Sequence, residues 1–190
     1  MRDIPASAES RWNVLVRHRA APDEATCGID AHAQALEPGR VVFRYRLRAD
    51  LSRLRIAPAM AAQRVHGLWR HTCFEAFIKT PGAASYYEFN FAPSGQWAAY
   101  RFEAYREGGV PSGLGACPEI AVRRFDDRLE LDAALRVEEW IAHPGASHFE
   151  VGLTAILEED NGRLSYWALN HAPGDADFHH PDGFVLGLSV

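Results

Sequence analysis

Alternation of apolar and polar side chains over short segments limits this chain to a small set of folds. In residues 40–49, RVVFRYRLRA, every second residue is apolar and the intervening positions are mostly arginine. Successive side chains of a β-strand point to opposite faces, so this period of two predicts a half-buried strand with a basic outer face. Turn-forming residues recur about every 8 to 12 residues, which is typical of antiparallel β-proteins.

About ten strands with little helix are expected from such patterns. They cover residues 12–19, 40–49, 71–79, 86–91, 96–105, 120–125, 128–135, 149–158, 163–170 and 184–190. We therefore predict a single all-β domain over residues 1–190, an antiparallel β-sandwich of the jelly-roll or immunoglobulin-like type.

Turn-forming residues predict the structure of the segments between these strands. The pairs at residues 126–127 (Asp-Asp) and 161–162 (Asn-Gly) are expected to close tight hairpins. Residues 137–142 are expected to form a short helical turn. The Ala-rich residues 54–69 and the Gly- and Pro-rich residues 107–118 are expected to be connections.

The composition excludes several functional classes. The 190 residues are 47% hydrophobic and 24% charged, with a net charge of -5, which argues against a nucleic-acid-binding surface. No segment approaches the ~20 apolar residues of a membrane-spanning helix, and the N-terminal residues lack the apolar centre of a secretory signal. The widely spaced Cys27, Cys73 and Cys117 are expected to be reduced thiols. We therefore expect a cytoplasmic protein that binds neither membranes nor nucleic acid.

Residues 71–79, 86–91 and 96–105 are expected to form three consecutive strands of one sheet. Alternation gives them an apolar core face formed by Phe74, Ala76, Ile78, Tyr87, Phe89, Phe91, Ala98, Tyr100, Phe102 and Ala104. A slip of one residue would bury charged groups, so the opposite faces are expected to coincide as well. That second face would carry Trp69, Glu75, Glu88, Asn90, Trp97, Arg101 and Glu103.

Such a face suits a neutral ligand with many hydroxyl groups. Indole rings stack on the C–H faces of sugars, while carboxylates, amides and guanidinium groups pair with hydroxyls. A solvated sandwich face of the same composition is the alternative.

The same residues could also suit a metal site, a thiol nucleophile or the carboxylate pair of a glycosidase. The loop at residues 171–183 holds histidines and aspartates that suit a divalent metal ion, but no HxH or HExxH spacing, so a solvated loop is expected. His71 and Cys73 lie roughly 7 Å apart on one strand face, too far for a nucleophile pair, so Cys73 is expected to be buried and structural. Glu75 and Glu88 could form the carboxylate pair of a glycoside hydrolase, which leaves catalysis open.

Three motifs in order carry a family resemblance. They are GLWRHTCFEAFIK (residues 67–79), YYEFNFAPSGQWAAYRF (86–102) and SYWALNHAPGDADFHHPDGFVLGL (165–188). The first is a strand with a central acid, the second a Tyr-rich strand with a Pro-x-Gly turn, and the third a Trp-x-x-Asn segment before a Pro-x-x-Phe strand start. Together they resemble the DOMON-like domains related to family 9 carbohydrate-binding modules, over residues 12–190. The resemblance extends to a bacterial subgroup whose genes accompany a cell-wall precursor reductase.

The resemblance implies a sandwich with a ligand face on one sheet, where two tryptophans clamp a terminal sugar and polar side chains bind its hydroxyls. It assigns the clamp to Trp69 and Trp167 and the hydroxyls to Glu75, Arg101 and Asn170, to which the shared strand face adds Asn90.

The expected function is therefore non-catalytic binding of a small saccharide or glycan precursor, with no resident cofactor or metal. One alternative is a haem or redox-cofactor domain that uses a histidine such as His71 or His171; another is a protein-interaction module. Haem-binding relatives use methionine and histidine ligands, and this chain has only Met1 and Met60. Calcium, common in family 9 modules, has no acidic loop pattern here.

Overall fold

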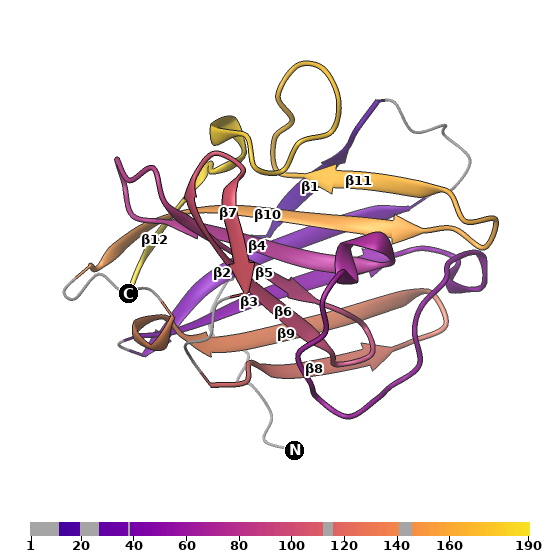
Figure 1. The fold of residues 1–190 in the computed structure, drawn as a ribbon. Coiled ribbons are helices and arrows are strands. Elements are labelled where there is room, and N and C mark those ends of the chain that lie inside the picture. Colours follow the sequence, from indigo (N-terminus) through magenta and orange to yellow (C-terminus); the bar gives the residue numbers. More distant parts are fainter. Residues whose placement is uncertain (1–11, 20–26, 38, 112–115, 141–145) are drawn as a thin grey trace.

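The computed structural model describes residues 12–19, 27–37, 39–111, 116–140 and 146–190 (Figure 1). These residues form twelve strands: β1 (Asn13–Arg17), β2 (Gly28–Glu37), β3 (Arg40–Arg48), β4 (Cys73–Lys79), β5 (Tyr86–Phe91), β6 (Trp97–Ala104), β7 (Glu107–Pro111), β8 (Glu119–Arg124), β9 (Arg128–Arg136), β10 (His148–Glu158), β11 (Leu164–Ala168) and β12 (Leu186–Ser189). The helices are single turns: η1 (Leu51–Arg53), η2 (Leu68–Arg70), η3 (Val137–Glu139) and η4 (Pro181–Gly183). Among the described residues, no helix is long and apolar enough to span a membrane.

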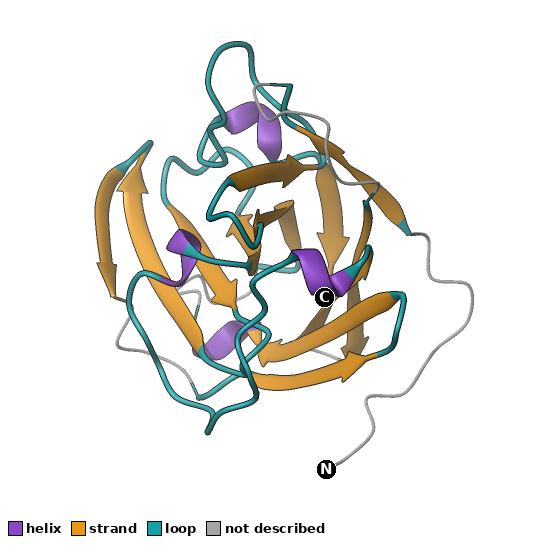
Figure 2. Ribbon diagram, turned by 90° about the vertical axis from the view of Figure 1, so that its right-hand side faces the viewer, coloured by secondary structure: helices purple, strands orange, loops and turns teal. Residues whose placement is uncertain are grey.

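The strands form two layers joined through β1. One layer, the front sheet, has the order β7-β6-β5-β4-β10-β11, with β12 paired to the first half of β10. The other, the back sheet, has the order β2-β3-β9-β8. Strand β1 pairs with β11 on one side and β2 on the other, and every pairing of named strands is antiparallel. Figure 1 shows β1 beside β11, and Figure 2 shows the strands from another side.

Side chains from the two layers meet in one core. The Phe43 ring of β3 stacks on Phe91 of β5 with centroids 6.2 Å apart, and Tyr45 packs on Phe74 at 5.0 Å. The Tyr45 hydroxyl also donates a 2.6 Å hydrogen bond to the backbone carbonyl of Glu75 across the interface. The predicted antiparallel β-sandwich is confirmed.

All ten expected strands are present, with ends shifted by a few residues, and β2 and β7 are two that were not expected. Strand β2 alternates correctly, but its inward residues after Ile29 are alanines, which give a weak strand signal. Strand β7 contains Gly108 and Gly109, both with positive φ, and pairs irregularly with β6. The hairpin between β8 and β9 and the Asn-Gly hairpin between β10 and β11 are confirmed. The expected helical turn is η3, and residues 141–142 lie outside the described residues.

Face assignments are correct for β4 and β5 and wrong for β6. Residues paired across neighbouring strands point to the same face. Phe91 pairs with Trp97, so Trp97 and Ala99 face the interlayer core, whereas Tyr100 pairs with Glu88 and faces outward. The outer face of the front sheet instead receives a second apolar cluster, formed by Leu68, Cys73, Phe77, Tyr86, Ala92, Ala98, Tyr100, Phe102 and Phe184. Alternation assigns the more apolar face of β6 to the core, but that face, with Ala98, Tyr100 and Phe102, is the outer one. Arg101 pairs with Tyr87 and therefore does not share a face with Glu75 and Glu88.

Candidate functional site

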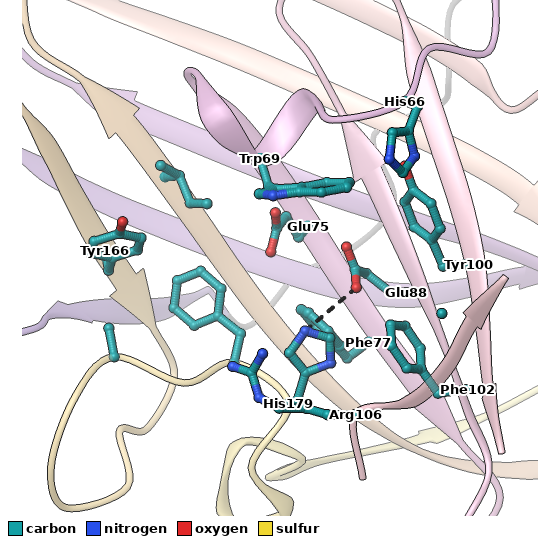
Figure 3. Close-up of a pocket in the computed structure, with 14 residues that line it drawn as sticks. His66, Trp69, Glu75, Phe77, Glu88, Tyr100, Phe102, Arg106, Tyr166 and His179 are labelled. Atoms are coloured by element: carbon teal, nitrogen blue, oxygen red, sulfur yellow. Dashed lines mark hydrogen bonds and ion pairs between the residues drawn. The ribbon is translucent and has the colours of Figure 1, made fainter. Parts of the chain in front are cut away.

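A cavity of about 340 Å³ opens on the outer face of the front sheet (Figure 3). Its size falls at the lower end of the range of roughly 300 to 1,000 Å³ for small-molecule sites. The residues that line it are His66, Trp69, Glu75, Phe77, Glu88, Tyr100, Phe102, Arg106, Gly109, Ile156, Tyr166, Ala176, Phe178 and His179. The sheet supplies the floor, and three connections supply the walls.

Two carboxyl groups form the polar part of the floor. Glu75 is paired with Asn90 across β4 and β5, and Glu88 with Phe77, so both acids point outward from neighbouring strands. The Glu75 Oε2 accepts a 3.1 Å hydrogen bond from the Thr154 hydroxyl, whereas its buried Oε1 has no hydrogen-bond partner among the described residues. The Glu88 Oε1 accepts a 2.6 Å hydrogen bond from the Asn90 amide.

Burial changes the protonation of both acids. Desolvation, and secondarily the charge of Glu88, raises the pKa of Glu75 well above its usual range, although the hydrogen bond from Thr154 opposes the rise. Desolvation raises the pKa of Glu88 to about 7 against the hydrogen bond from Asn90 and the charge of Arg106. The raised pKa favours the protonated form of Glu75, which can donate a hydrogen bond, while Glu88 is close to its midpoint at neutral pH.

Aromatic rings surround these acids. The half-buried Trp69 meets Tyr100 edge to face, with centroids 5.5 Å apart, and the Tyr100 hydroxyl lies 2.9 Å from His66 Nδ1. Phe102 lies flat on Tyr86 at 4.7 Å. In the view of Figure 3 the two carboxyl groups lie between the rings of Trp69 and His179. The cavity therefore offers ring faces and carboxyl groups within the same space.

The loop that joins β11 to β12, residues 169–185, forms the wall opposite Trp69. Its Asp177 accepts hydrogen bonds from Arg106 Nη2 at 2.7 Å, from the Tyr105 hydroxyl, and from the backbone N–H of His179 at 3.0 Å. The loop also approaches the sheet closely at Gly152, where an added Cβ would lie 2.9 Å from the Gly183 carbonyl oxygen. Glycine on β10 therefore permits this loop to pack against the sheet.

His179 faces the acids as a neutral ring. Burial lowers the pKa of His179 to about 4, with a further contribution from the charge of Arg106. Its Nδ1 lies 2.8 Å from the Tyr86 hydroxyl, and its Nε2 lies 3.7 Å from Glu88 Oε2, beyond hydrogen-bonding distance. A neutral His179 that accepts from Tyr86 at Nδ1 carries its hydrogen on Nε2, toward Glu88. Because His179 is neutral, the pair is not a salt bridge.

The structure brings together three of the six expected site residues. Trp69 and Glu75 line the cavity, and Asn90 lies fully buried beneath it as a partner of Glu88. The remaining three, Arg101, Trp167 and Asn170, do not line it.

Each of these three side chains lies outside the cavity and has a different partner. Arg101 is exposed and pairs with Glu103 at 3.2 Å. Trp167 belongs to the interlayer core and donates from its indole N–H to Ser165 Oγ at 3.0 Å, so the expected clamp with Trp69 is wrong. The exposed Asn170 donates to the backbone carbonyl of Asp182.

Several lining residues were missed for one reason. Tyr166 pairs with Ile156 of β10, and both line the cavity. The aromatic residue that β11 supplies to the cavity is therefore Tyr166 and not the expected Trp167. For Tyr100 and Phe102, alternation predicts the core face, whereas both line the cavity. Alternation predicted that two faces exist in each case, but only the register with the adjacent strand shows which face is outward.

The alternative chemistries find less support. Cys73 is buried, with a pKa raised by desolvation, and His71 Nδ1 lies 2.6 Å from Glu158 Oε2, so they form no nucleophile pair. No group of three or more potential metal ligands occurs among the described residues. Neither His71 nor His171 lines the cavity, and the Met60 side chain is 54% exposed, which does not fit an axial pair for haem.

Comparison with known proteins shows similarity in structure. No protein-family model matches the chain, and no curated protein matches its sequence. A candidate carbohydrate-binding protein from Bacteroides uniformis superposes with a TM-score of 0.66 and 14% identity, over 95% of this chain and 86% of the other. A family 9 carbohydrate-binding module from Caldicellulosiruptor kristjanssonii in complex with cellotriose gives a TM-score of 0.58 and 9% identity, over 95% and 82%. A glucose complex of such a module from that organism gives 0.59 and 9%, over 100% and 91%.

These similarities establish the fold. The chain has the architecture of a family 9 carbohydrate-binding module. The relation to DOMON-like domains and the gene neighbourhood stay predictions.

Proposed function

We propose that this protein is a non-catalytic binding module for a small saccharide, held in the cavity on the front sheet. The observation that carries the proposal is the convergence of Glu75, Glu88 and the Trp69 ring on one space in a fold shared with sugar-binding modules. Aromatic faces pack on the C–H surfaces of a pyranose, and buried carboxyl groups select hydroxyl positions by hydrogen bonding.

Each lining group has a role in this proposal. Trp69 stacks on the sugar ring, with Tyr100 and Tyr166 at its edges. Glu75 hydrogen-bonds to the ligand through its otherwise unpaired Oε1, and Glu88 accepts from a hydroxyl group. Asn90 acts through Glu88, which it orients by their 2.6 Å hydrogen bond.

The test is a calorimetric titration of mono- and disaccharides with the wild-type protein and with Trp69→Ala. Loss of the stacking ring is expected to weaken binding by about tenfold or more, equivalent to roughly 1.4 kcal/mol. Trp12→Ala is the matched control, because Trp12 lies outside the cavity and packs on Arg46 of the back sheet at 4.5 Å. Absence of binding to every sugar, at protein concentrations that detect millimolar affinity, would refute the proposal.

The pair of acids also favours a second candidate function, glycoside hydrolysis. Two buried carboxyl groups, each with a raised pKa, face one cavity, and such pairs supply the acid of glycosidases. Aryl glycosides of any sugar that binds distinguish the two functions. A binding module leaves them intact, whereas turnover that is lost in both Glu75→Gln and Glu88→Gln would replace the proposed function with catalysis.

A further inference from the structure

The floor of the cavity holds acids without a matching cation. Glu75 is 2% exposed and Glu88 6% exposed, and no salt bridge from an arginine or lysine to either is present among the described residues. Among the residues that the structure describes, Arg106 is the one arginine or lysine that lines the cavity, and its Nη2 lies 2.7 Å from Asp177 Oδ1. The cavity therefore holds two acidic side chains that no arginine or lysine of the described residues neutralises.

One carboxyl oxygen shows this most directly. Glu75 Oε1 is buried and has no hydrogen-bond partner among the described residues, although Oε2 of the same group accepts from Thr154. Buried polar atoms in native proteins are nearly always paired, so an unpaired one at the floor of a cavity marks a position for a ligand atom. A carboxylate oxygen is paired best by a charged donor.

The rings around the acids favour the same ligand charge. Trp69, Tyr100, Phe102 and Phe178 line the cavity. The faces of such rings carry partial negative charge and attract ammonium groups, most strongly away from water. A neutral sugar would use the ring faces and leave the acids protonated, whereas an ammonium group would also pair with their ionised forms.

We propose that the ligand carries an ammonium group, which lies between Glu75 and Glu88, and that the saccharide is an amino sugar with a free amine. This inference rests on the proposed function, since it names the class of saccharide that the same cavity binds. The ammonium group would donate to Glu75 Oε1 and to Glu88 Oε2, while the sugar ring packs on Trp69.

Proton release is the consequence that separates this ligand from a neutral one. The titratable or charged groups around Glu88 are Cys73 and Glu75 from β4, Tyr86 from β5, Tyr100 from β6, Arg106 from the β6–β7 turn, and Asp177 and His179 from the 169–185 loop. His66 and Tyr166 are two further titratable residues of the cavity lining. Burial raises the pKa values of Cys73, Tyr86 and Tyr100, so these groups stay neutral near pH 7, as does His179. Arg106 and Asp177 stay charged and paired. An ammonium group would lower the pKa values of Glu75 and Glu88, so its binding expels protons from these two acids.

The experiment compares matched sugars, glucose with glucosamine and galactose with galactosamine, by calorimetry at about pH 6.5 in two buffers of different ionisation enthalpy. At least one amino sugar is expected to bind about tenfold or more tightly than its neutral partner and to release protons, at most one from each of the two acids. The neutral sugars are expected to release none.

Isosteric variants locate the effect. Glu75→Gln and Glu88→Gln are each expected to reduce the ratio of amino-sugar to neutral-sugar affinity toward one and to remove that acid's share of the proton release. Glu103→Gln is the matched control, because Glu103 is exposed on β6 and outside the cavity, and it should preserve the ratio. Near-ultraviolet circular dichroism checks that each variant is folded.

The outcomes separate the two proposals. Equal affinity for amino and neutral sugars, or a preference that survives both glutamine variants, overturns the amine inference and leaves saccharide binding in place. Failure of all four sugars to bind overturns both.

Discussion

Glu88 links the binding site to the stability of the protein. Its pKa is raised to about 7 by burial, against 4.5 for an ordinary glutamate. Between about pH 4.5 and pH 7 the folded state therefore keeps a proton that the unfolded state releases, and the free energy of unfolding falls as pH rises. Glu88→Gln removes this dependence, so the variant is expected to gain on the order of 2 kcal/mol relative to wild type across that window.

Chemical denaturation at several pH values measures this gain. His179 contributes the opposite slope, because its pKa is lowered to about 4 and the folded state loses stability as pH falls below the ordinary value of 6.5. The difference between variant and wild type cancels that contribution, provided His179 is unchanged. Glu103→Gln, on the exposed part of β6, should show a flat difference. A flat difference for Glu88→Gln as well would mean that this carboxyl group is not buried in solution.

At the scale of single elements, the 169–185 loop completes the cavity because β10 has a glycine beneath it. In Gly152→Ala the new Cβ would lie 2.9 Å from the Gly183 carbonyl oxygen, and a backbone atom cannot move aside without moving η4. We expect the loop to shift outward with Phe178 and His179, weakening ligand binding several-fold and destabilising the fold by about 1 to 2 kcal/mol.

Gly187→Ala provides the control for this prediction. Gly187 lies on the neighbouring β12, and an added Cβ there would meet no atom within 4 Å. Calorimetric affinity and thermal unfolding of the two variants should therefore differ clearly. If Gly152→Ala bound ligand as tightly as Gly187→Ala, the loop would not be part of the site.

The elements themselves were largely predictable, while the faces of some were not. Alternation identified β3, β4 and β5 together with their core residues, because charged or amide side chains occur on only one face of each strand. It failed for β6 and β11, where aromatic residues occupy both faces. The choice of Trp167 over Tyr166 depended on the register with β10, which is set by contacts between residues far apart in the chain. The loop residues Phe178 and His179 reach the cavity through tertiary contacts that no local pattern encodes.

At the scale of the whole molecule, the inner and outer faces of the front sheet have different roles. The inner face stabilises the sandwich, and the outer face forms the proposed binding site. Interlayer packing of Phe43, Tyr45, Phe74 and Phe91 holds the sandwich together, while the opposite side of β4 and β5 forms the cavity floor. The Tyr45 hydroxyl connects the two, since it donates at 2.6 Å to the carbonyl of Glu75, whose side chain enters the cavity on the other side.

Tyr45→Phe tests whether these two roles are separable. The variant keeps the ring and removes a buried hydrogen bond, leaving the Glu75 carbonyl without this donor, so the free energy of unfolding is expected to fall by about 1 to 3 kcal/mol. Strand pairing between β4, β5 and β10 continues to hold the Glu75 backbone, so ligand affinity should stay within about twofold of wild type. Urea denaturation and calorimetric titration of the same preparation measure both quantities. A large loss of affinity without loss of stability would show that the back sheet tunes the cavity directly through Glu75, and that the two layers do not act independently.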